Sequence, residues 1–288
     1  MAKKKGRSKK RNNKYNTEWV RIKRIITFIV WIAFVITSLF YTARYFYNDI
    51  SNALFPVENY SEKLMKVKLK PGMDVERIDY TGHSVYFNSD YRIPNCVVYE
   101  LIENELEGTV PRYKNFDADP RVRLSATTQD YIRSGYDRGH MAPAGDMKWS
   151  RNAMRETFYL SNICPQHKSL NTGTWHKLEN RVREWTKHDS ALIVVSGPIL
   201  SGNMKTIGDN EVAVPSHFFK AVLAPYTVPQ RAIGFVFEND KCTKKLKKYA
   251  VSIDEIERIT GYDLFYELDD SVEGIIESHC NYNEWTQR

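Results

Sequence analysis

The sequence predicts an α+β domain that follows a single membrane-spanning helix. Three observations support this class. One uninterrupted apolar stretch lies near the N-terminus, five short β-branched or aromatic runs lie further along the chain, and two segments show helical patterns. Because strands and helices are interspersed without a regular βαβ alternation, we expect a central, mostly antiparallel sheet flanked by helices.

The apolar stretch covers residues 25–43 and has Arg24 and Arg44 on either side. About 20 apolar residues in a helix span the hydrocarbon core of a bilayer. A cleaved signal peptide is the alternative, but its apolar core is usually shorter and is followed by a small-residue cleavage pattern, which is not evident here. The sequence therefore favours an uncleaved transmembrane signal anchor.

Charge is distributed unevenly along the chain and predicts an orientation in the membrane. Residues 1–24 hold eleven of the 42 Lys and Arg residues but one of the 35 Asp and Glu residues. Positively charged flanks stay in the cytoplasm. We therefore expect a basic cytoplasmic tail at 1–24, a single-pass anchor in the cell membrane at 25–43, a stalk at 44–70, and a catalytic domain at 71–288 on the outer, periplasmic or extracellular side.

The same distribution limits what net charge says about partners. The formal net charge of the whole chain is +7, but the residues after the tail comprise 31 basic and 34 acidic side chains. Global charge therefore gives no support to nucleic-acid binding by the folded domain. Any attraction for phosphate in that domain has to be local.

Four cysteines lie on the predicted outer side, where disulfides can form: Cys96, Cys164, Cys242 and Cys280. Cys242 and Cys280 are the favoured pair, because a bridge would tie the C-terminal region together. Cys96 lies in an apolar run and is expected to be a buried free thiol. No Cys-x-x-Cys spacing indicates zinc. The histidines match no zinc pattern either, which leaves them as surface or core residues: His167, His176, His188 and His217.

Secondary structure follows from these patterns in chain order. Strands are expected in the apolar runs at 84–90, 96–101, 191–197, 218–224 and 232–238. A helix is expected from Thr172 to about His188. A second helix should begin near Ser252, which forms a capping-box pattern with Glu255, and end near Gly261.

Two polar segments do not fit a purely structural interpretation. The first is Asp-Arg-Gly-His-Met-Ala-Pro at 137–143, in which the histidine, with an ordinary pKa near 6.5, can accept a proton at neutral pH. In the second, Asn171, Trp175, Glu179 and Arg183 recur every fourth residue, so a helix would present them in one row. The alternatives are a structural histidine, an ordinary solvated helix face, and a packing role for Trp175.

Together these segments resemble the DNA/RNA non-specific endonucleases, the ββα-metal (His-Me finger) nucleases of the Serratia nuclease and endonuclease G type. Residues 137–140 match the DRGH motif of that family. Asn162, Pro165, Gln166 and the Asn171 to Arg183 series follow in the family's order and spacing. Residues 214–220 are similar to a later strand of the family. The resemblance covers roughly residues 75–270.

The resemblance implies a role for each matching residue. His140 corresponds to the general base that activates water. Asn171 corresponds to the sole direct protein ligand of Mg²⁺, for which Mn²⁺ or another divalent cation is an alternative, and Glu179 holds the metal through water. Arg138 and Arg183 correspond to cations that face the phosphate. Asn162 corresponds to a residue that supports the site and its water network.

One position departs from the family pattern. The family commonly has a further arginine upstream of DRGH, and the local match places Lys114 there, with Arg112 nearby. Lysine neutralises charge but lacks the bidentate fork of a guanidinium. The sequence does not choose between these two residues.

The resemblance therefore implies a metal-dependent endonuclease that hydrolyses DNA and RNA without sequence preference. Two alternatives come from other classes. One is a catalytically silent module that binds nucleic acid at the cell surface, and the other is a metal-dependent phosphodiesterase for small substrates. Expected partners are DNA, RNA and, through residues 25–43, a membrane. The oligomeric state stays open, with a homodimer as one option.

Overall fold

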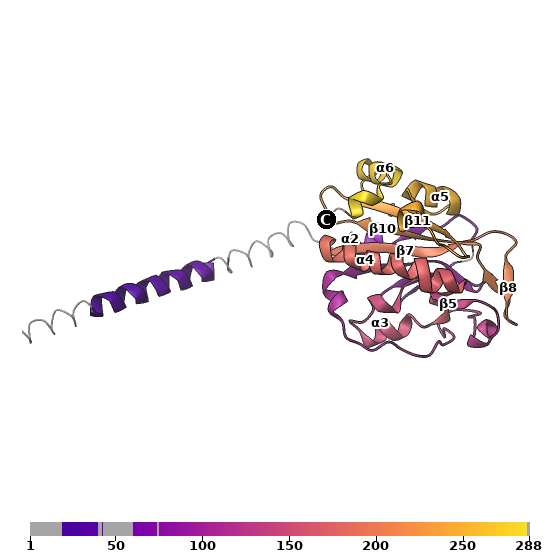
Figure 1. Cartoon of the computed structure of the whole chain (residues 1–288), viewed down its shortest axis with the longest axis horizontal. Coiled ribbons are helices and arrows are strands. Elements are labelled where there is room, and N and C mark those ends of the chain that lie inside the picture. Colours follow the sequence, from indigo (N-terminus) through magenta and orange to yellow (C-terminus); the bar gives the residue numbers. More distant parts are fainter. Residues whose placement is uncertain (1–18, 40–41, 43–59, 74, 287–288) are drawn as a thin grey trace, which may run out of the picture. The chain divides into compact units, whose positions relative to one another are not determined.

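A computed structural model describes residues 19–39, 42, 60–73 and 75–286. The chain divides into two compact units, Met1–Glu58 and Asn59–Arg288. The first contains a helix at Trp19–Leu39 that is long and apolar enough to cross a membrane (Figure 1). This helix begins six residues before the predicted span. The predicted end of the span and the stalk up to residue 59 lie outside the described residues.

The second unit begins earlier than the predicted domain. Helix α2 (Tyr60–Leu64) and strand β1 (Val67–Lys68) fall within the predicted stalk. Strand β1 pairs in antiparallel fashion with β13 (Asp263–Leu264), close to the other end of the unit. Leu64 is fully buried in a core cluster. These residues are therefore part of the folded unit and not a spacer.

A seven-stranded sheet forms the centre of this unit, in the order β12-β11-β10-β7-β4-β3-β2. Every neighbouring pair is antiparallel. Five of its strands confirm the five apolar runs: β3 (Ser84–Asn88), β4 (Ile93–Ile102), β7 (Ala191–Ile199), β10 (His217–Ala224) and β11 (Arg231–Glu238). The edge strands are β2 (Glu76–Asp79) and β12 (Ala250–Val251).

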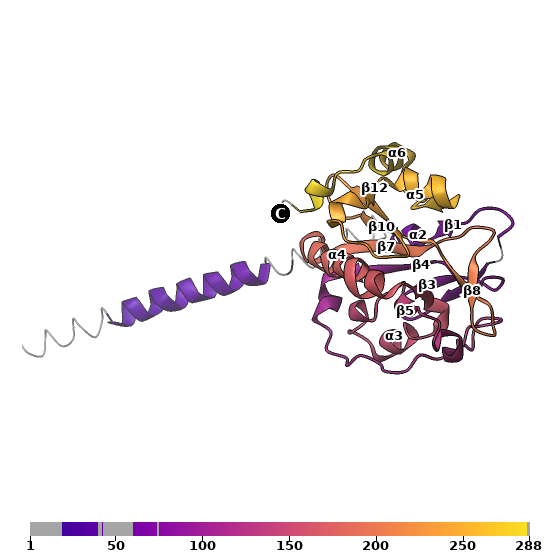
Figure 2. The same cartoon turned by 45° about the vertical axis from the view of Figure 1, so that its right-hand side comes forward.

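The two faces of the sheet carry separate cores, because alternate side chains of a strand point to opposite faces. In β10, Phe218 belongs to one cluster and Phe219 to the other. The first face is covered by α4 (His176–Asp189), and the second by α5 (Ile253–Thr260) and α6 (Asp270–Ser278) (Figures 1 and 2). The expected sheet with flanking helices is confirmed.

Both predicted helices are present. Helix α4 is preceded by a π-helical turn at Leu170–Trp175. Helix α5 has the predicted caps: the Ser252 hydroxyl accepts a hydrogen bond from the N–H of Glu255 at 3.2 Å, and Gly261 ends the helix with φ +73°. A left-handed residue that closes a helix is most easily a glycine.

A long excursion between β4 and β7 lies on the α4 side of the sheet. It contains strands β5 (Asp137–His140) and β6 (Ile163–Gln166), which pair in antiparallel fashion, and helix α3 (Arg151–Glu156) between them. Short 3-10 turns connect these elements at Glu103–Glu107, Thr128–Tyr131, Ala144–Asp146 and Leu160–Asn162. A further two-stranded sheet consists of β8 (Lys205–Ile207) and β9 (Val212–Val214).

The structure contradicts the predicted disulfide. All four cysteines lie within the described residues and are free. Cys242 packs against the first core cluster, whereas Cys280 follows α6, whose buried Ile276 belongs to the second cluster. Cys242 is partly buried and Cys280 is exposed. Cys96 is the buried free thiol that was expected.

Candidate active site

Strand β5 presents the histidine of the DRGH motif, and its pairing with β6 requires the glycine. Gly139 lies opposite Cys164, and His140 lies opposite Ile163. A Cβ added at Gly139 would lie 2.6 Å from the Cβ of Gln166, closer than two carbon atoms can approach without displacement. The glycine therefore lets the two strands pair beside a fully buried glutamine side chain.

Asn162 supports the backbone that follows the histidine. Its Oδ1 accepts from the N–H of Ala142 at 2.9 Å, and its Nδ2 donates to the carbonyls of Ala142 and Thr157 at 2.9 and 2.8 Å. The side chain is fully buried. Asn162 therefore positions the chain beside His140 and does not line the pocket described below.

The His140 ring lies in an aromatic setting. Its centroid is 4.9 Å from that of Phe158, edge to face, and 5.4 Å from that of Phe116. Nε2 is buried and has no hydrogen-bond partner among the described residues. The backbone carbonyl of His140 accepts from Nε1 of Trp175 at 3.2 Å. Two aromatic rings thus pack against the imidazole, and a hydrogen bond fixes the backbone of the same residue.

Burial determines the protonation state of this histidine. Desolvation, with smaller contributions from the charge of Arg112 and from His83, lowers the pKa of His140 to about 3. Burial disfavours the charged imidazolium, and a nearby guanidinium acts in the same direction. The ring is therefore neutral at physiological pH, which is the form that can accept a proton.

A pocket of about 690 Å³ opens beside His140. Asn171 reaches it from the π-helical turn, and Glu179 and Arg183 reach it from α4. Sequence reasoning did not assign most of the other lining residues: Leu106, Arg112, Pro143, Ala144, Gly145, Lys148, Thr172, His176, Asn180 and Lys187. The structure thus brings together two segments that are about 30 residues apart in the sequence.

The orientation of the Asn171 amide is defined by its neighbour. Its Nδ2 donates to Oδ2 of Asp137 at 3.0 Å. An ionised carboxylate can only accept, so the amide nitrogen has to face Asp137. The amide oxygen, which is the atom a hard cation requires, is on the other branch. The first residue of the DRGH motif therefore aims the side chain of Asn171.

Glu179 and Arg183 form a charged wall of the pocket. Oε2 of Glu179 lies 3.4 Å from Nδ1 of His176 and 4.0 Å from Nη2 of Arg183, and the side chain of Glu179 is 10% exposed. The hydrogen bond and charge of Glu179 raise the pKa of His176. The carboxylate is thus held between two nitrogen donors at the pocket's edge.

Arg183 is held mainly by a carboxylate that sequence reasoning missed. Its Nε donates to Oδ1 of the fully buried Asp146 at 2.5 Å, and its Nη1 donates to Oδ1 of Asn180 at 2.7 Å. A Cβ added at Gly145 would lie 2.4 Å from Nη2 of Arg183, so the glycine leaves room for the guanidinium. Nothing in the spacing of Asp146 indicates this partner.

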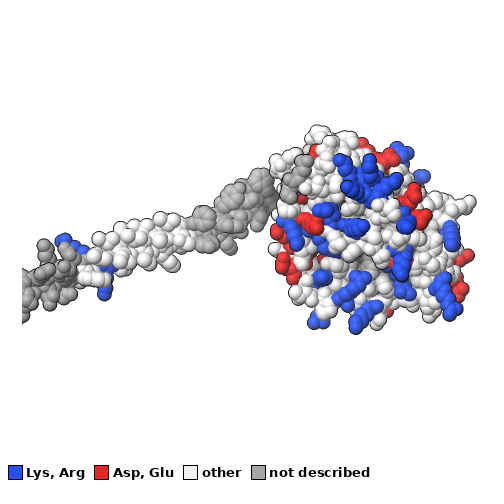
Figure 3. Space-filling model, viewed as in Figure 1, with Lys and Arg blue, Asp and Glu red and all other residues white. Residues whose placement is uncertain are grey.

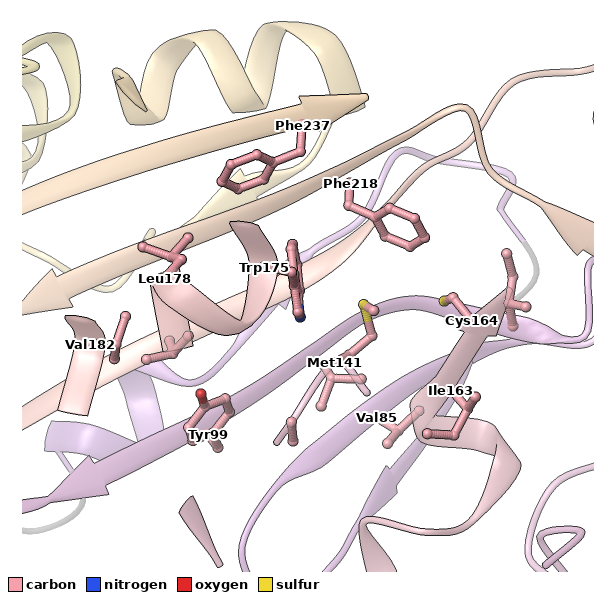
Figure 4. Packing of buried hydrophobic residues seen from close by; sticks show 14 of the residues in the cluster. Val85, Tyr99, Met141, Ile163, Cys164, Trp175, Leu178, Val182, Phe218 and Phe237 are labelled. Atoms are coloured by element: carbon pink, nitrogen blue, oxygen red, sulfur yellow. The ribbon is translucent and has the colours of Figure 1, made fainter. Parts of the chain in front are cut away.

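The predicted row of four side chains is wrong in one member. Trp175 is 1% exposed and packs edge to face on Phe218 and Phe237 at 5.9 and 6.0 Å (Figure 4). Trp175 directly precedes α4, and the wider π-helical turn at Leu170–Trp175 changes the angle between Asn171 and Trp175 around the helix axis. Trp175 therefore belongs to the core, which agrees with the packing alternative.

Two other candidate cations lie outside the pocket lining. The guanidinium of Arg138 lies over the rings of Phe116 and Tyr131, at 5.2 and 5.8 Å from their centroids. Lys114 lines a separate depression, whereas Arg112 lines both this depression and the pocket beside His140. The structure thus places Arg112, and not Lys114, next to the imidazole.

The pocket is locally basic although the domain as a whole is not. Its lining includes four permanently basic side chains and a single carboxylate, Glu179; the basic residues are Arg112, Lys148, Arg183 and Lys187. Lys and Arg side chains are also numerous on the face that carries α4 (Figure 3). The attraction for phosphate that the global charge does not provide is therefore available locally.

Comparison with known proteins agrees with this geometry. A family model described as DNA/RNA non-specific endonuclease matches residues 60–271. The mitochondrial nuclease EXOG of Mus musculus is 34% identical over 242 residues, which cover 75% of this chain and 64% of EXOG. The mitochondrial nuclease of Saccharomyces cerevisiae is 40% identical over 207 residues, or 63% of each chain. This chain thus spans about three fifths of these relatives.

Solved structures give the same result. A chain from the crystal structure of the EndoG/EndoGI complex superposes with a TM-score of 0.65 and is 30% identical, covering 69% of this chain and 89% of that chain. At this similarity the central antiparallel sheet and its flanking helices are shared.

The relatives correct the predicted location. EXOG, endonuclease G and the Saccharomyces cerevisiae nuclease are all mitochondrial, so the prediction of a single-pass cell-membrane protein with an outer catalytic domain is wrong. A basic tail before an apolar helix shows that a segment can enter a membrane, but it does not specify which membrane.

The family match covers most of the folded unit, from α2 to the start of α6. It includes the DRGH strand, the π-helical turn and α4, which together supply the residues of the pocket. This chain belongs to the DNA/RNA non-specific endonuclease family.

Proposed function

We propose that this chain is a metal-dependent endonuclease that hydrolyses phosphodiester bonds of DNA and RNA without sequence preference. In this proposal, β5, β6 and α4 form the ββα-metal arrangement. The observation that carries it is the shared pocket of His140, Asn171 and Glu179, in which basic side chains predominate. A site built around phosphate contacts the nucleic-acid backbone, which carries no base information.

His140 acts as the general base. Its neutral ring can accept a proton from water at the pocket, and Phe116 and Phe158 keep it from rotating away. A base with a pKa of about 3 would be weak. The negative charge of an incoming phosphate favours the protonated ring, and it therefore raises this pKa towards the working range once substrate is bound.

The residues present fit a hard divalent cation such as Mg²⁺. This ion prefers oxygen ligands and keeps several of its waters. The amide oxygen of Asn171 would be the direct ligand, because the amide nitrogen donates to Asp137. The carboxylate of Glu179, in the same pocket, would hold the ion through water. When bound, the ion neutralises charge on the phosphate and the leaving oxygen.

The basic side chains divide into two groups. Arg112, Lys148 and Lys187 line the pocket and are proposed to bind phosphate oxygens of the substrate. Arg183 is fixed by Asp146 and holds Glu179 in place while adding positive charge. Arg138 contacts the ring of Phe116 and is proposed to act through it on the position of His140.

Digestion of plasmid DNA and of RNA by the full-length chain tests the proposal. Cleavage should require Mg²⁺ and stop with EDTA. His140→Ala should lower the rate by about 10²–10⁴-fold, the usual contribution of general base catalysis. His188→Ala is the matched control, because this exposed histidine lies in the last turn of α4 and is not among the residues that line the pocket.

Two outcomes would overturn the proposal. Cleavage by His140→Ala at the rate of the control would remove the mechanism. Salt-sensitive binding of DNA without turnover would indicate a binding module instead. Bis-p-nitrophenyl phosphate, assayed in parallel, distinguishes a small-substrate phosphodiesterase, which would hydrolyse it and leave the polymers intact.

A further inference from the structure

Three carboxylates from α5 and α6 converge on the side of the sheet opposite the active-site pocket. Asp254 and Glu257 lie one turn apart on α5, and Glu277 lies in the last turn of α6. Each offers an oxygen atom that is within 4.8 Å of the oxygens offered by the other two. Asp254 is exposed, Glu257 is partly buried and Glu277 is buried.

Glu277 is the member whose surroundings point to a ligand. Its side chain is 4% exposed, and its buried Oε1 has no hydrogen-bond partner among the described residues. Buried carboxylate oxygens are normally paired with donors or coordinate a metal, because burying an unpaired charge is costly. The Oε1 atom of Glu277 is therefore a buried acceptor without a counterpart in the described part of the chain.

The neighbouring charges do not supply that counterpart. The charged groups that act most strongly on Glu277 are all carboxylates: Glu257, Glu273, Asp254 and Asp263. Lys68 forms its ion pair with Asp263, at 3.0 Å. Glu257 accepts a hydrogen bond from the N–H of Leu264 at 2.6 Å, which fixes one end of its carboxylate. The cluster thus requires a positive charge from solution, either protons or a cation.

We propose that Asp254, Glu257 and Glu277 form a Ca²⁺ site that joins α5 to α6, separate from the nuclease pocket. Hard cations take carboxylate oxygens as ligands. Ca²⁺ takes six to eight oxygen ligands at about 2.3–2.6 Å in a flexible geometry, whereas Mg²⁺ requires a near-ideal octahedron at about 2.0–2.1 Å. Three carboxylate oxygens that all lie within 4.8 Å of one another fit the wider and more adaptable ligand shell of Ca²⁺.

The exposure gradient fits entry of the ion from solvent. Asp254 at the surface leaves room for water ligands, and Glu277 closes the site on the inner side. Because α5 and α6 both pack on β11, the ion would hold these two helices together over the second face of the sheet. The site is expected to stabilise the fold and to leave DNA cleavage in Mg²⁺ unchanged.

Calorimetric titration and thermal unfolding of the full chain with CaCl₂ test this site. Asn171→Ala is used as the background, which removes the proposed ligand of the catalytic metal. This protein should bind about one Ca²⁺ and unfold at a higher temperature with Ca²⁺ than with EDTA. Adding Glu277→Gln, which keeps shape but removes charge, should weaken Ca²⁺ binding at least tenfold and abolish the shift.

Glu273→Gln in the same background is the matched control, because it removes a charge one turn earlier in α6 from a residue outside the trio. It should retain the Ca²⁺ response. Asp254→Asn, at the exposed member, should weaken binding even if Glu277→Gln fails to fold. Equal Ca²⁺ responses in all these variants, or none in the Asn171→Ala protein, would show that the cluster holds only protons and would overturn the proposal.

Discussion

The orientation of His140 depends on residues that do not reach the pocket. Asn162 bonds to the backbone of Ala142, two residues further along the chain, and Trp175 bonds to the carbonyl of His140 itself. Both side chains are buried. A side chain that is held through its backbone keeps its geometry before a substrate binds. This matters for the proposed base, because its ring nitrogen Nε2 has no hydrogen-bond partner in the part of the chain that the structure describes.

Replacing the supporting amide tests this dependence. Asn162→Ala removes three hydrogen bonds and leaves buried backbone groups of Ala142 and Thr157 without partners. Each unsatisfied group costs about 1–3 kcal/mol, so urea unfolding should show a clear loss of stability. Nuclease activity should also fall under conditions in which the variant is folded. Asn203→Ala, at an exposed loop position, should change neither quantity.

A second buried histidine predicts acid sensitivity. His83 is 3% exposed, neither ring nitrogen has a partner among the described residues, and burial lowers its pKa to about 3. Between pH 6.5 and 3 the unfolded chain binds a proton that the folded chain does not. The free energy of unfolding should therefore decrease as the pH is lowered from 6.5 to 3. Above pH 6.5 the contribution of His83 should be constant.

His83→Phe removes this titration while keeping a flat ring. The difference in unfolding free energy between pH 7 and pH 5 should be smaller for the variant than for the parent chain. His140 titrates in the same direction and is present in both proteins, so the comparison isolates His83. Equal pH dependence would contradict the buried, neutral state of His83.

At the scale of elements, the sequence was informative where apolar runs were long. Strands β3, β4, β7, β10 and β11 carry such runs, and the caps of α5 were readable because Ser252 and Gly261 have specific backbone roles. Strands β5 and β6 have four residues each, so neither could be recognised from periodicity, although a motif marked β5.

The site was predictable to a similar degree and for related reasons. Spacing drew attention to His140, Asn171, Glu179 and Arg183, the resemblance to the family assigned their roles, and all four line one pocket. The π-helical turn, which changes the angle between Asn171 and Trp175 around the helix axis, leaves no trace in the spacing. Asp146 was missed because an ion pair over 37 residues of sequence depends on tertiary packing.

The ion pair between Arg183 of α4 and Asp146 should stabilise the fold more than an exposed ion pair on the same helix. Arg183 pairs with a fully buried carboxylate, whereas Arg181 pairs with the exposed Glu184 at 2.5 Å. Arg183→Ala should cost about 3–5 kcal/mol of unfolding free energy, because it leaves Asp146 buried and unpaired. Arg181→Ala should cost about 0–1 kcal/mol. Equal losses in urea unfolding would contradict this difference.

For the whole molecule, the folded unit begins near residue 59, and truncations can test this boundary. Residues 59–288 should fold and cleave DNA, because their contacts lie within one compact unit. Removal of residues up to 70 deletes Leu64 and Val67, which are 0% and 7% exposed. Burying one aliphatic side chain contributes about 1.5–3 kcal/mol, so the 71–288 fragment should unfold at a lower temperature. Equal melting temperatures would place the boundary at the predicted position.

The location was the part of the whole-molecule prediction that failed. Eleven basic residues before an apolar helix gave an orientation with respect to a membrane. The identity of the membrane depends on recognition by a targeting machinery, and neither hydropathy nor charge balance encodes it directly. Net charge was also a poor indicator of the ligand. The residues after the tail are slightly acidic overall, whereas the pocket lining is basic and suited to phosphate.

The proposed mechanism requires Asn171 to hold the catalytic metal beside His140. The most direct measurement is the rate of plasmid cleavage over a series of Mg²⁺ concentrations for Asn171→Ala and the exposed control Asn203→Ala. The control should follow the parent chain, whereas Asn171→Ala should lose about 10²-fold or more of its rate and need far more Mg²⁺ for the remaining cleavage. An unchanged rate and Mg²⁺ dependence in Asn171→Ala would show that this amide does not hold the metal.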